Sequence, residues 1–254
     1  DEPLDLVVEK KKSVRRAVLL NCLDRLYGHC LLKLLNAQFY LHHRPDLGLI
    51  VLVPRILRWL VPDGTAEIWT VNLPLARGIE WNDWLARKIR RRVEALDECH
   101  LSVAFSHPHP SDFDIERFSR VKPFPLDEWE ERLKKPTVTF IWREDRPWSA
   151  IPSSKIVQQI WRYVVRLRRR MGYSQLAIQE QSRKVAMLAS KLRKRFPTLD
   201  FAVAGLGKPG GLPEWIPDLR LTKPTEDTER ALCERYASSH VVVGVHGSNM
   251  VLPS

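Results

Sequence analysis

Short apolar runs alternate with longer amphipathic segments along the first half of the chain. The apolar runs are typical of buried strands and predict strands at residues 17–22, 49–54, 66–72 and 100–105. In the segments between them apolar side chains recur at helical spacing, which predicts helices at residues 29–41, 56–60 and 82–96. Strands that alternate with helices favour an α/β domain built on a parallel sheet.

The same alternation starts again after residues 106–135, a segment rich in proline and charge. We therefore expect two domains, an N-terminal one at residues 1–133 and a C-terminal one at residues 134–254. The second domain has predicted strands at residues 137–142, 201–205, 219–221 and 240–245, and predicted helices at residues 154–171, 174–195 and 227–238. Strand–helix–strand order with right-handed crossovers describes a Rossmann-like unit, and two such units leave a cleft between them.

Composition narrows the class of protein. Apolar residues make up 44% and charged residues 28% of the 254 positions, which excludes a disordered or collagen-like chain. No apolar run approaches the roughly 20 residues of a membrane-spanning helix, and the first residues have no apolar core of a secretory signal. The four cysteines form no CxxC pair, so we expect reduced thiols rather than a zinc site or a disulfide framework.

The formal net charge is +11, and the whole excess lies in the second half of the chain. Residues 1–133 hold 20 basic and 20 acidic side chains, whereas residues 134–254 hold 21 basic and 10 acidic ones. Eleven of the basic residues lie between Arg162 and Arg195, against a single acid, Glu180. Such a field attracts phosphorylated ligands, polyanions or an anionic membrane surface, although a solvated helix face has the same composition. Nucleic acid is a weaker expectation, because no zinc finger, RNP sequence or helix-turn-helix pattern accompanies the charge.

A glycine turn follows the last predicted strand, in the stretch VVVGVHGSNM. Ligands of parallel α/β sheets bind beyond the carboxyl ends of the strands. Gly247 lets the backbone turn sharply, so that N–H groups at Ser248 and Asn249 form an anion site suited to a diphosphate. His246 would donate to the diphosphate or to a sugar. An ordinary strand-to-helix turn capped by Ser248 or Asn249, with a structural His246, is the alternative interpretation.

Three short motifs occur in order along the chain. They are Tyr27–Leu32 (YGHCLL), Thr137–Arg146 (TVTFIWREDR), and Val243–Asn249 (VGVHGSN) followed by Leu252 and Pro253. In the same order they resemble three segments of glycosyltransferase family 61: the early Y-x-H-[FW]-L-L helix, the strand that opens the second domain, and the G-x-H-G-A-G-L-x-x-x-L-F-x-P segment. The chain departs from the last of these in having HGSN where the family has HGAG.

The resemblance implies a glycosyltransferase of the GT-B type, with two facing Rossmann-like domains and parallel sheets. It implies that the C-terminal domain holds a nucleotide-diphosphate sugar such as a UDP-sugar, with no metal ion or resident cofactor, because protein cations and dipoles stabilise the diphosphate. It also implies that the family's donor domain continues past residue 254 with a further helix-rich stretch. The charge count agrees, because the positive half is the one that would hold the diphosphate.

Four further residues are candidates for holding the donor. Arg143 and Arg146 follow the strand at 137–142, and guanidinium groups bind phosphate oxygens in a planar fork, although Glu144 and Asp145 are alternative partners. Lys208 lies in a glycine-rich loop that could instead be merely flexible. Glu226 opens the helix before the last strand, where a carboxylate would hold ribose hydroxyls or simply favour the helix dipole.

The resemblance assigns the acceptor and the general base to the first domain. Asp24 and His29 flank the turn after its first predicted strand, and an inverting transfer needs a carboxylate or an imidazole near the acceptor hydroxyl. Each has a structural alternative: Asp24 as a helix cap, and His29 packed against Tyr27.

The leading hypothesis is therefore a hexosyl- or pentosyltransferase with a glycan or other hydroxyl acceptor, in the cytoplasm and in peripheral contact with an anionic membrane. Two alternatives stay open. One is a nucleic-acid-binding α/β protein that uses the basic helices at residues 162–195. The other is a nucleotide-sugar-binding module without catalysis.

Overall fold

The computed structural model describes residues 4–102, 104, 109–144, 175–244, 247 and 250–252. The chain divides into two compact units. The first unit comprises Asp1–Lys122 and Gly247–Leu252, and the second comprises Pro123–His246. Each unit is built on its own sheet.

The first unit is a five-stranded sheet in the order β1-β4-β3-β2-β5. Its strands are β1 Leu6–Lys10, β2 Arg16–Asn21, β3 Gly48–Pro54, β4 Glu67–Val71 and β5 Glu98–Leu101. Only β1 is antiparallel, and it pairs with β4 at the edge of the sheet. The parallel strands β2, β3 and β4 follow one another across the sheet, and β5 returns to the other side of β2. This reversal of strand order beside the first parallel strand is the arrangement of a Rossmann-like half.

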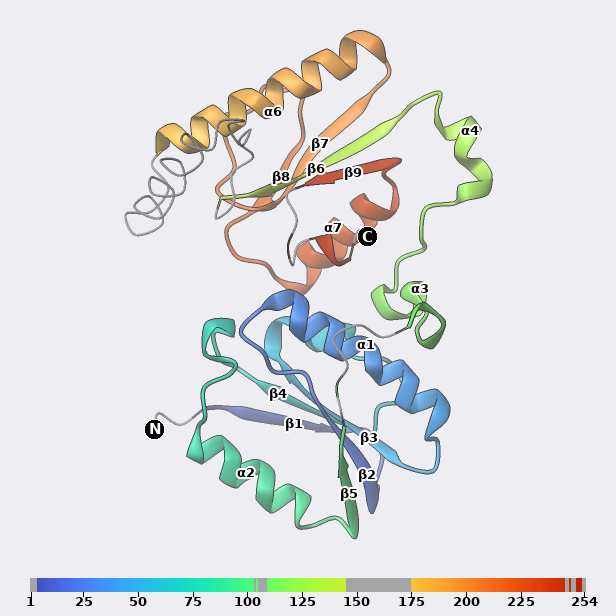
Figure 1. Ribbon diagram of the computed structural model, residues 1–254, viewed down its shortest axis with the longest axis vertical. Coiled ribbons are helices and arrows are strands. Elements are labelled where there is room, and N and C mark those ends of the chain that lie inside the picture. Colours follow the sequence, from blue (N-terminus) through green and yellow to red (C-terminus); the bar gives the residue numbers. More distant parts are fainter. Residues whose placement is uncertain are drawn as a thin grey trace, which may run out of the picture. The chain divides into compact units, whose positions relative to one another are not determined.

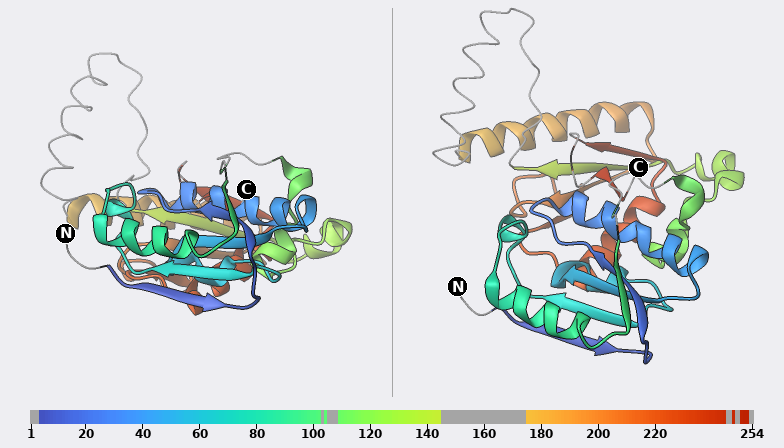
Figure 2. Two further views of the ribbon diagram at one scale, coloured as in Figure 1. Left: turned by 90° about the horizontal axis from the view of Figure 1, so that it is seen from below. Right: turned by 60° about the horizontal axis from the view of Figure 1, so that its bottom comes forward.

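Helices α1 (Tyr27–His43) and α2 (Asp83–Val93) cover opposite faces of this sheet (Figure 1, Figure 2). β2 and β3 are apolar along almost their whole length because both of their faces are covered. On the α2 side, Ala17 and Leu19 of β2 belong to a buried cluster with Leu85 of α2. The first unit also contains α3 (Ile115–Ser119) and short 3₁₀ turns at Arg55–Leu60, Leu75–Arg77 and Pro110–Asp112.

The second unit is a four-stranded sheet in the order β8-β7-β6-β9, and all its strands are parallel (Figure 1). The strands are β6 Thr137–Arg143, β7 Asp200–Leu206, β8 Asp218–Leu221 and β9 Val241–Gly244. The helices are α4 Trp129–Arg132, α6 Gln175–Arg195 and α7 Glu226–Ala237, with a 3₁₀ turn at Leu126–Glu128. The strand order again reverses beside the first parallel strand, between β6 and β9, so the second unit repeats the Rossmann-like plan of the first.

The α/β class and the parallel sheets predicted from the sequence are confirmed. The predicted helix at residues 154–171 lies outside the described residues. Strand β1, whose Val7 is half exposed at the sheet edge, was not predicted from the sequence. Residues 123–133, assigned from the sequence to the first domain, group with the second unit because the rings of Phe124 and Trp129 pack on His240.

Candidate active site

The carboxyl ends of β2 and β5 meet at the strand-order reversal of the first unit. In doubly wound sheets this is where ligands bind, because the connections leave the two strands in opposite directions and open a crevice. β2 ends at Asn21, and the loop that follows it carries Asp24 into the start of α1. His29 lies in the first turn of that helix. The structure therefore places both sequence-predicted catalytic residues at the carboxyl edge of the sheet.

Asp24 is the centre of a hydrogen-bonded cluster. Its Oδ1 lies 3.3 Å from Nδ1 of His29 and accepts the backbone N–H of Leu26 at 3.2 Å. Its Oδ2 accepts from Nζ of Lys33 at 2.9 Å, and the same ammonium group also donates to the carbonyl oxygen of Leu23 at 3.1 Å. Both carboxylate oxygens are thus engaged, and the Asp24 side chain is only 14% exposed.

This environment keeps Asp24 ionised. Partial burial disfavours the charged carboxylate, but the hydrogen bonds from Lys33 and Leu26 and the positive charge of Lys33 outweigh it. The pKa of Asp24 consequently lies below its ordinary value of 3.8. Because its two oxygens already accept hydrogen bonds from Leu26 and Lys33, Asp24 is better suited to hold a neighbouring group than to take a proton itself.

His29 is the member of this cluster that reaches solvent, with half of its side chain exposed. Its Nδ1 faces Oδ1 of Asp24 at ion-pair distance, and with the proton on Nδ1 the other ring nitrogen, Nε2, carries a lone pair. In the part of the chain that the structure describes, Nε2 has no hydrogen-bond partner. An imidazole oriented by a carboxylate through one nitrogen is the usual arrangement of a general base that acts through the other. Oδ1 of Asp24 also accepts the N–H of Leu26 at the start of α1, so a capping role exists beside the contacts to His29 and Lys33.

Close packing of the backbone fixes the Asp24 loop. The Sγ of buried Cys30 donates to the carbonyl oxygen of Asp24 at 3.3 Å. Gly78 approaches the same peptide so closely that a Cβ at position 78 would lie 2.2 Å from that oxygen. Gly78 has an ordinary φ of −63°, so the requirement for glycine here is space and not conformation.

Arg143 and Lys208 lie at the carboxyl edge of the second sheet. Arg143 is the last residue of β6 and pairs in register with Leu206 of β7. Lys208 follows Leu206 by two residues. Glu144 joins the two segments, because its Oε1 accepts the backbone N–H of Lys208 at 3.0 Å. The structure thus brings these two sequence-predicted phosphate-binding residues to the same edge of one sheet, with the Lys208 side chain exposed.

The glycine-rich loop around Lys208 is held by a buried ion pair that the sequence analysis did not find. Asp218 and Arg220 form two hydrogen bonds, Nε to Oδ1 at 2.7 Å and Nη2 to Oδ2 at 2.6 Å. Oδ2 of Asp218 also accepts the N–H of Gly210 at 2.8 Å, and Arg220 lies over the ring of Trp142 at 4.4 Å from its centroid. Asp218 and Arg220 are two residues apart on β8, so their side chains lie on the same side of the strand. This Asp-x-Arg spacing is the feature of the sequence from which the pair could have been predicted.

The remaining predicted donor residues are only partly described. Glu226 is the first residue of α7, where Thr225 provides the cap, and its carboxylate pairs with Arg230 at 3.2 Å. Gly247 has a φ of +151° and its carbonyl accepts the N–H of Met250 at 2.9 Å, so a turn that favours glycine is present. The other predicted donor-site residues, Arg146, His246, Ser248 and Asn249, lie outside the described residues.

Within residues 4–102, 109–144 and 175–244, no group of three or more His, Cys, Asp or Glu side chains is arranged to hold a metal ion. No helix in these ranges is both long enough and apolar enough to cross a membrane.

Comparison of the chain with protein-family models, with curated proteins and with solved structures finds no match.

Proposed function

We propose that the protein is a GT-B-type glycosyltransferase that moves a hexose or pentose from a nucleotide-diphosphate donor to the hydroxyl group of a glycan or other acceptor. The observation that carries the proposal is the Asp24–His29 pair at the strand-order reversal of the first unit. A cationic edge on a second Rossmann-like unit, with Arg143 and Lys208, supports it. The proposal requires these two edges to face each other across a cleft, as in GT-B enzymes.

In the proposed reaction, Nε2 of His29 removes the proton of the acceptor hydroxyl as its oxygen attacks the anomeric carbon. The bond from that carbon to the donor diphosphate breaks with inversion, and the diphosphate leaves with the electron pair. Asp24 stabilises the imidazolium that forms, and Lys33 keeps the Asp24 carboxylate ionised. Arg143, Lys208 and the N–H groups of the Gly247 turn stabilise the charge of the departing diphosphate. None of these steps uses a metal ion or a resident cofactor.

Membrane contact is part of the proposal, and α2 supplies a surface for it. The apolar side of α2, with Leu85 and Ile89, packs on the sheet. Its outer side exposes five cations, at Arg87, Lys88, Arg90, Arg91 and Arg92. A basic helix face of this kind is attracted to anionic lipid. Sedimentation with vesicles of phosphatidylglycerol, compared with phosphatidylcholine, tests the contact.

The described part of α6 gives the nucleic-acid alternative less support than its charge count indicates. Arg183 and Lys184 both pair with Glu180, and Arg193 lies over the ring of Trp215. These cations stabilise the helix and its packing. Steeply salt-dependent binding to random DNA or RNA would nevertheless favour that alternative over the transferase.

A thermal-shift screen against UDP-, GDP- and CMP-sugars tests donor binding, because a ligand that binds only the folded protein raises its melting temperature. The wild type should be stabilised by at least one donor, and Arg143→Ala and Lys208→Ala should reduce that shift. Glu214→Gln changes an exposed side chain of the same unit and should leave it unchanged. Donor binding without turnover on any glycan extract would favour the binding module without catalysis.

A further inference from the structure

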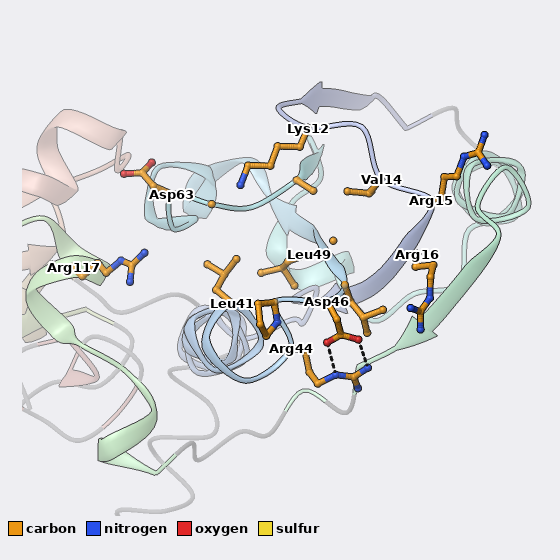
Figure 3. A pocket seen from close by; sticks show the side chains of 15 residues that line it. Lys12, Val14, Arg15, Arg16, Leu41, Arg44, Asp46, Leu49, Asp63 and Arg117 are labelled. Carbon is orange, nitrogen blue, oxygen red and sulfur yellow. Dashed lines mark hydrogen bonds and ion pairs between the residues drawn. The ribbon is translucent and has the colours of Figure 1, made fainter.

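The first unit contains a cavity of about 570 Å³ at the amino edge of its sheet (Figure 3). It opens beside the start of β2 and β3, and its lining includes Arg16, Gly48 and Leu49. Asp24 and His29 follow the other end of β2, so this cavity is separate from the candidate active site. Its volume lies within the range of roughly 300–1,000 Å³ that is typical of small-molecule sites.

Cations dominate the lining of this cavity. Five basic side chains contribute to it against two carboxylates: Lys12, Arg15, Arg16, Arg44 and Arg117 against Asp46 and Asp63. Three of these cations have carboxylate partners: Arg44 forms two hydrogen bonds with Asp46, at 3.0 and 3.1 Å, Arg16 pairs with Glu98, and Arg15 lies 3.8 Å from Asp97.

Lys12 and Arg117 differ from these three cations in having no carboxylate partner among the described residues. Lys12 follows β1 and Arg117 belongs to α3, and both reach toward the space beside Leu41 in Figure 3. Asp63, the other carboxylate of the lining, lies 4.0 Å from Arg120. Two cations that come from distant parts of the chain to one cavity form a site for an anion.

Hydrogen bonds hold the two backbone segments that carry these cations. The N–H of Lys12 donates to the carbonyl of Ala66 at 3.1 Å. The helix that carries Arg117 is attached to α1 by buried Gln38, which donates to the carbonyl of Asp114 at 3.1 Å and accepts its N–H at 2.6 Å. These contacts fix the backbone positions from which the Lys12 and Arg117 side chains reach the cavity.

The floor of the cavity is apolar. Leu41, Pro45 and Leu49 line it, and Val14 packs so closely on Gly48 that a Cβ at position 48 would lie 2.5 Å from it. An apolar floor with a cationic rim matches a ligand that has an apolar or planar body and an anionic group. Inorganic anions would use the rim alone, and a nucleic-acid duplex would not enter a cavity of this size.

We infer that this cavity binds a phosphorylated small molecule, with the phosphate between Lys12 and Arg117 and its organic body on Leu41, Pro45 and Leu49. This inference does not rest on the proposed transferase activity. The same phosphate chemistry occurs on a free metabolite and on a lipid headgroup, and the test separates the two sources.

The test uses 1-naphthyl phosphate as the probe, with uncharged 1-naphthol and inorganic phosphate as comparison ligands, in calorimetric titrations of the whole chain. We expect the naphthyl phosphate to bind more tightly than either comparison ligand. Lys12→Met and Arg117→Met should each weaken it about tenfold, the effect of losing one charge-assisted hydrogen bond. Lys122→Met removes an exposed cation of the same unit outside the cavity and should leave binding within about twofold. Arg143→Ala should also retain binding, which separates this site from the donor site.

Equal binding by the wild type and by both cavity variants, with circular dichroism showing that the variants are folded, would overturn the inference. So would equal weakening by Lys122→Met, because the effect would then be one of net charge. Sedimentation with phosphatidate vesicles identifies the source of the phosphate. Lys12-dependent sedimentation assigns the cavity to a lipid headgroup, and binding of the soluble probe without sedimentation assigns it to a free metabolite.

Discussion

Nδ1 of His29 lies 3.3 Å from Oδ1 of Asp24, between the first parallel strand of the sheet and the helix that follows it. The contact joins a half-exposed imidazole to a carboxylate that is almost covered. Lys33 bonds the other oxygen of Asp24 from one turn further along the same helix. The charged cluster is therefore built almost entirely from one loop and one helix end, and its geometry depends on how that loop is held.

Replacing Asp24 by Asn should slow sugar transfer by about 10²–10⁴-fold without weakening donor binding, because the imidazole loses the charge that stabilises its protonated form. The lowered pKa of Asp24 keeps the wild-type carboxylate ionised at every pH above its ordinary value of 3.8. The pH–rate profile above about pH 5 should consequently show no titration of Asp24. Steady-state kinetics with the best donor measure both effects, and an Asp24→Asn enzyme with wild-type kcat would remove the pair from the mechanism.

Gly78→Ala should disturb the Asp24 loop from outside the cluster. A Cβ at this position meets the Asp24 carbonyl at 2.2 Å, so the loop must move, at a cost of about 1–3 kcal/mol in unfolding free energy. The imidazole resonances of His29 in an NMR spectrum should shift with it. Gly210→Ala, in the other unit, should leave those resonances unchanged. Unshifted His29 resonances in Gly78→Ala would show that the loop is not held in this way.

Asp218→Asn should destabilise the second unit by about 3 kcal/mol, because the buried guanidinium of Arg220 loses its counterion. Burial opposes ionisation of Asp218, but the hydrogen bonds from Arg220 and Gly210 outweigh it and lower its pKa below 3.8. A carboxylate with a lowered native pKa contributes stability above its unfolded pKa and loses it as the pH falls through the native value.

Urea unfolding at pH 6 and pH 3 measures this linkage. The wild type should lose more stability between the two pH values than Asp218→Asn, which has no carboxylate to titrate. Glu214→Gln, an exposed change near the same loop, should stay within about 0.5 kcal/mol of the wild type. Parallel acid sensitivity of the wild type and Asp218→Asn would contradict the assignment.

The thiols should differ sharply in reactivity. Burial raises the pKa of Cys30 to about 11 and that of Cys233 to about 12, and it also raises the pKa of Cys22. Cys99 is only partly buried. Ellman's reagent at pH 8 should therefore titrate Cys99 alone in the native protein and all four cysteines in guanidinium chloride. Rapid native reaction of Cys30 would show that its helix opens readily.

The strands that the sequence predicted best are those covered on both faces. β3 and β7 are continuous apolar runs, and the structure starts and ends each of them within one residue of the prediction. β1 was missed because an edge strand needs only one apolar side, and its residues lead directly into a lysine run.

The candidate site was predictable only in part. The positions of Asp24 and His29 after a strand were visible in the sequence, whereas the role of Lys33 depends on the helix that places it four residues beyond His29 on the same face. The cavity lined by Lys12 and Arg117 could not be anticipated, because tertiary contacts of Gln38 and Ala66 bring their two segments to it.

Single-turnover transfer of a labelled sugar by His29→Ala, measured beside its calorimetric donor affinity, tests the central claim most directly. We expect the variant to bind the donor within about twofold of the wild type and to transfer the sugar about 10²–10⁴-fold more slowly. Transfer by His29→Ala at the wild-type rate would contradict it.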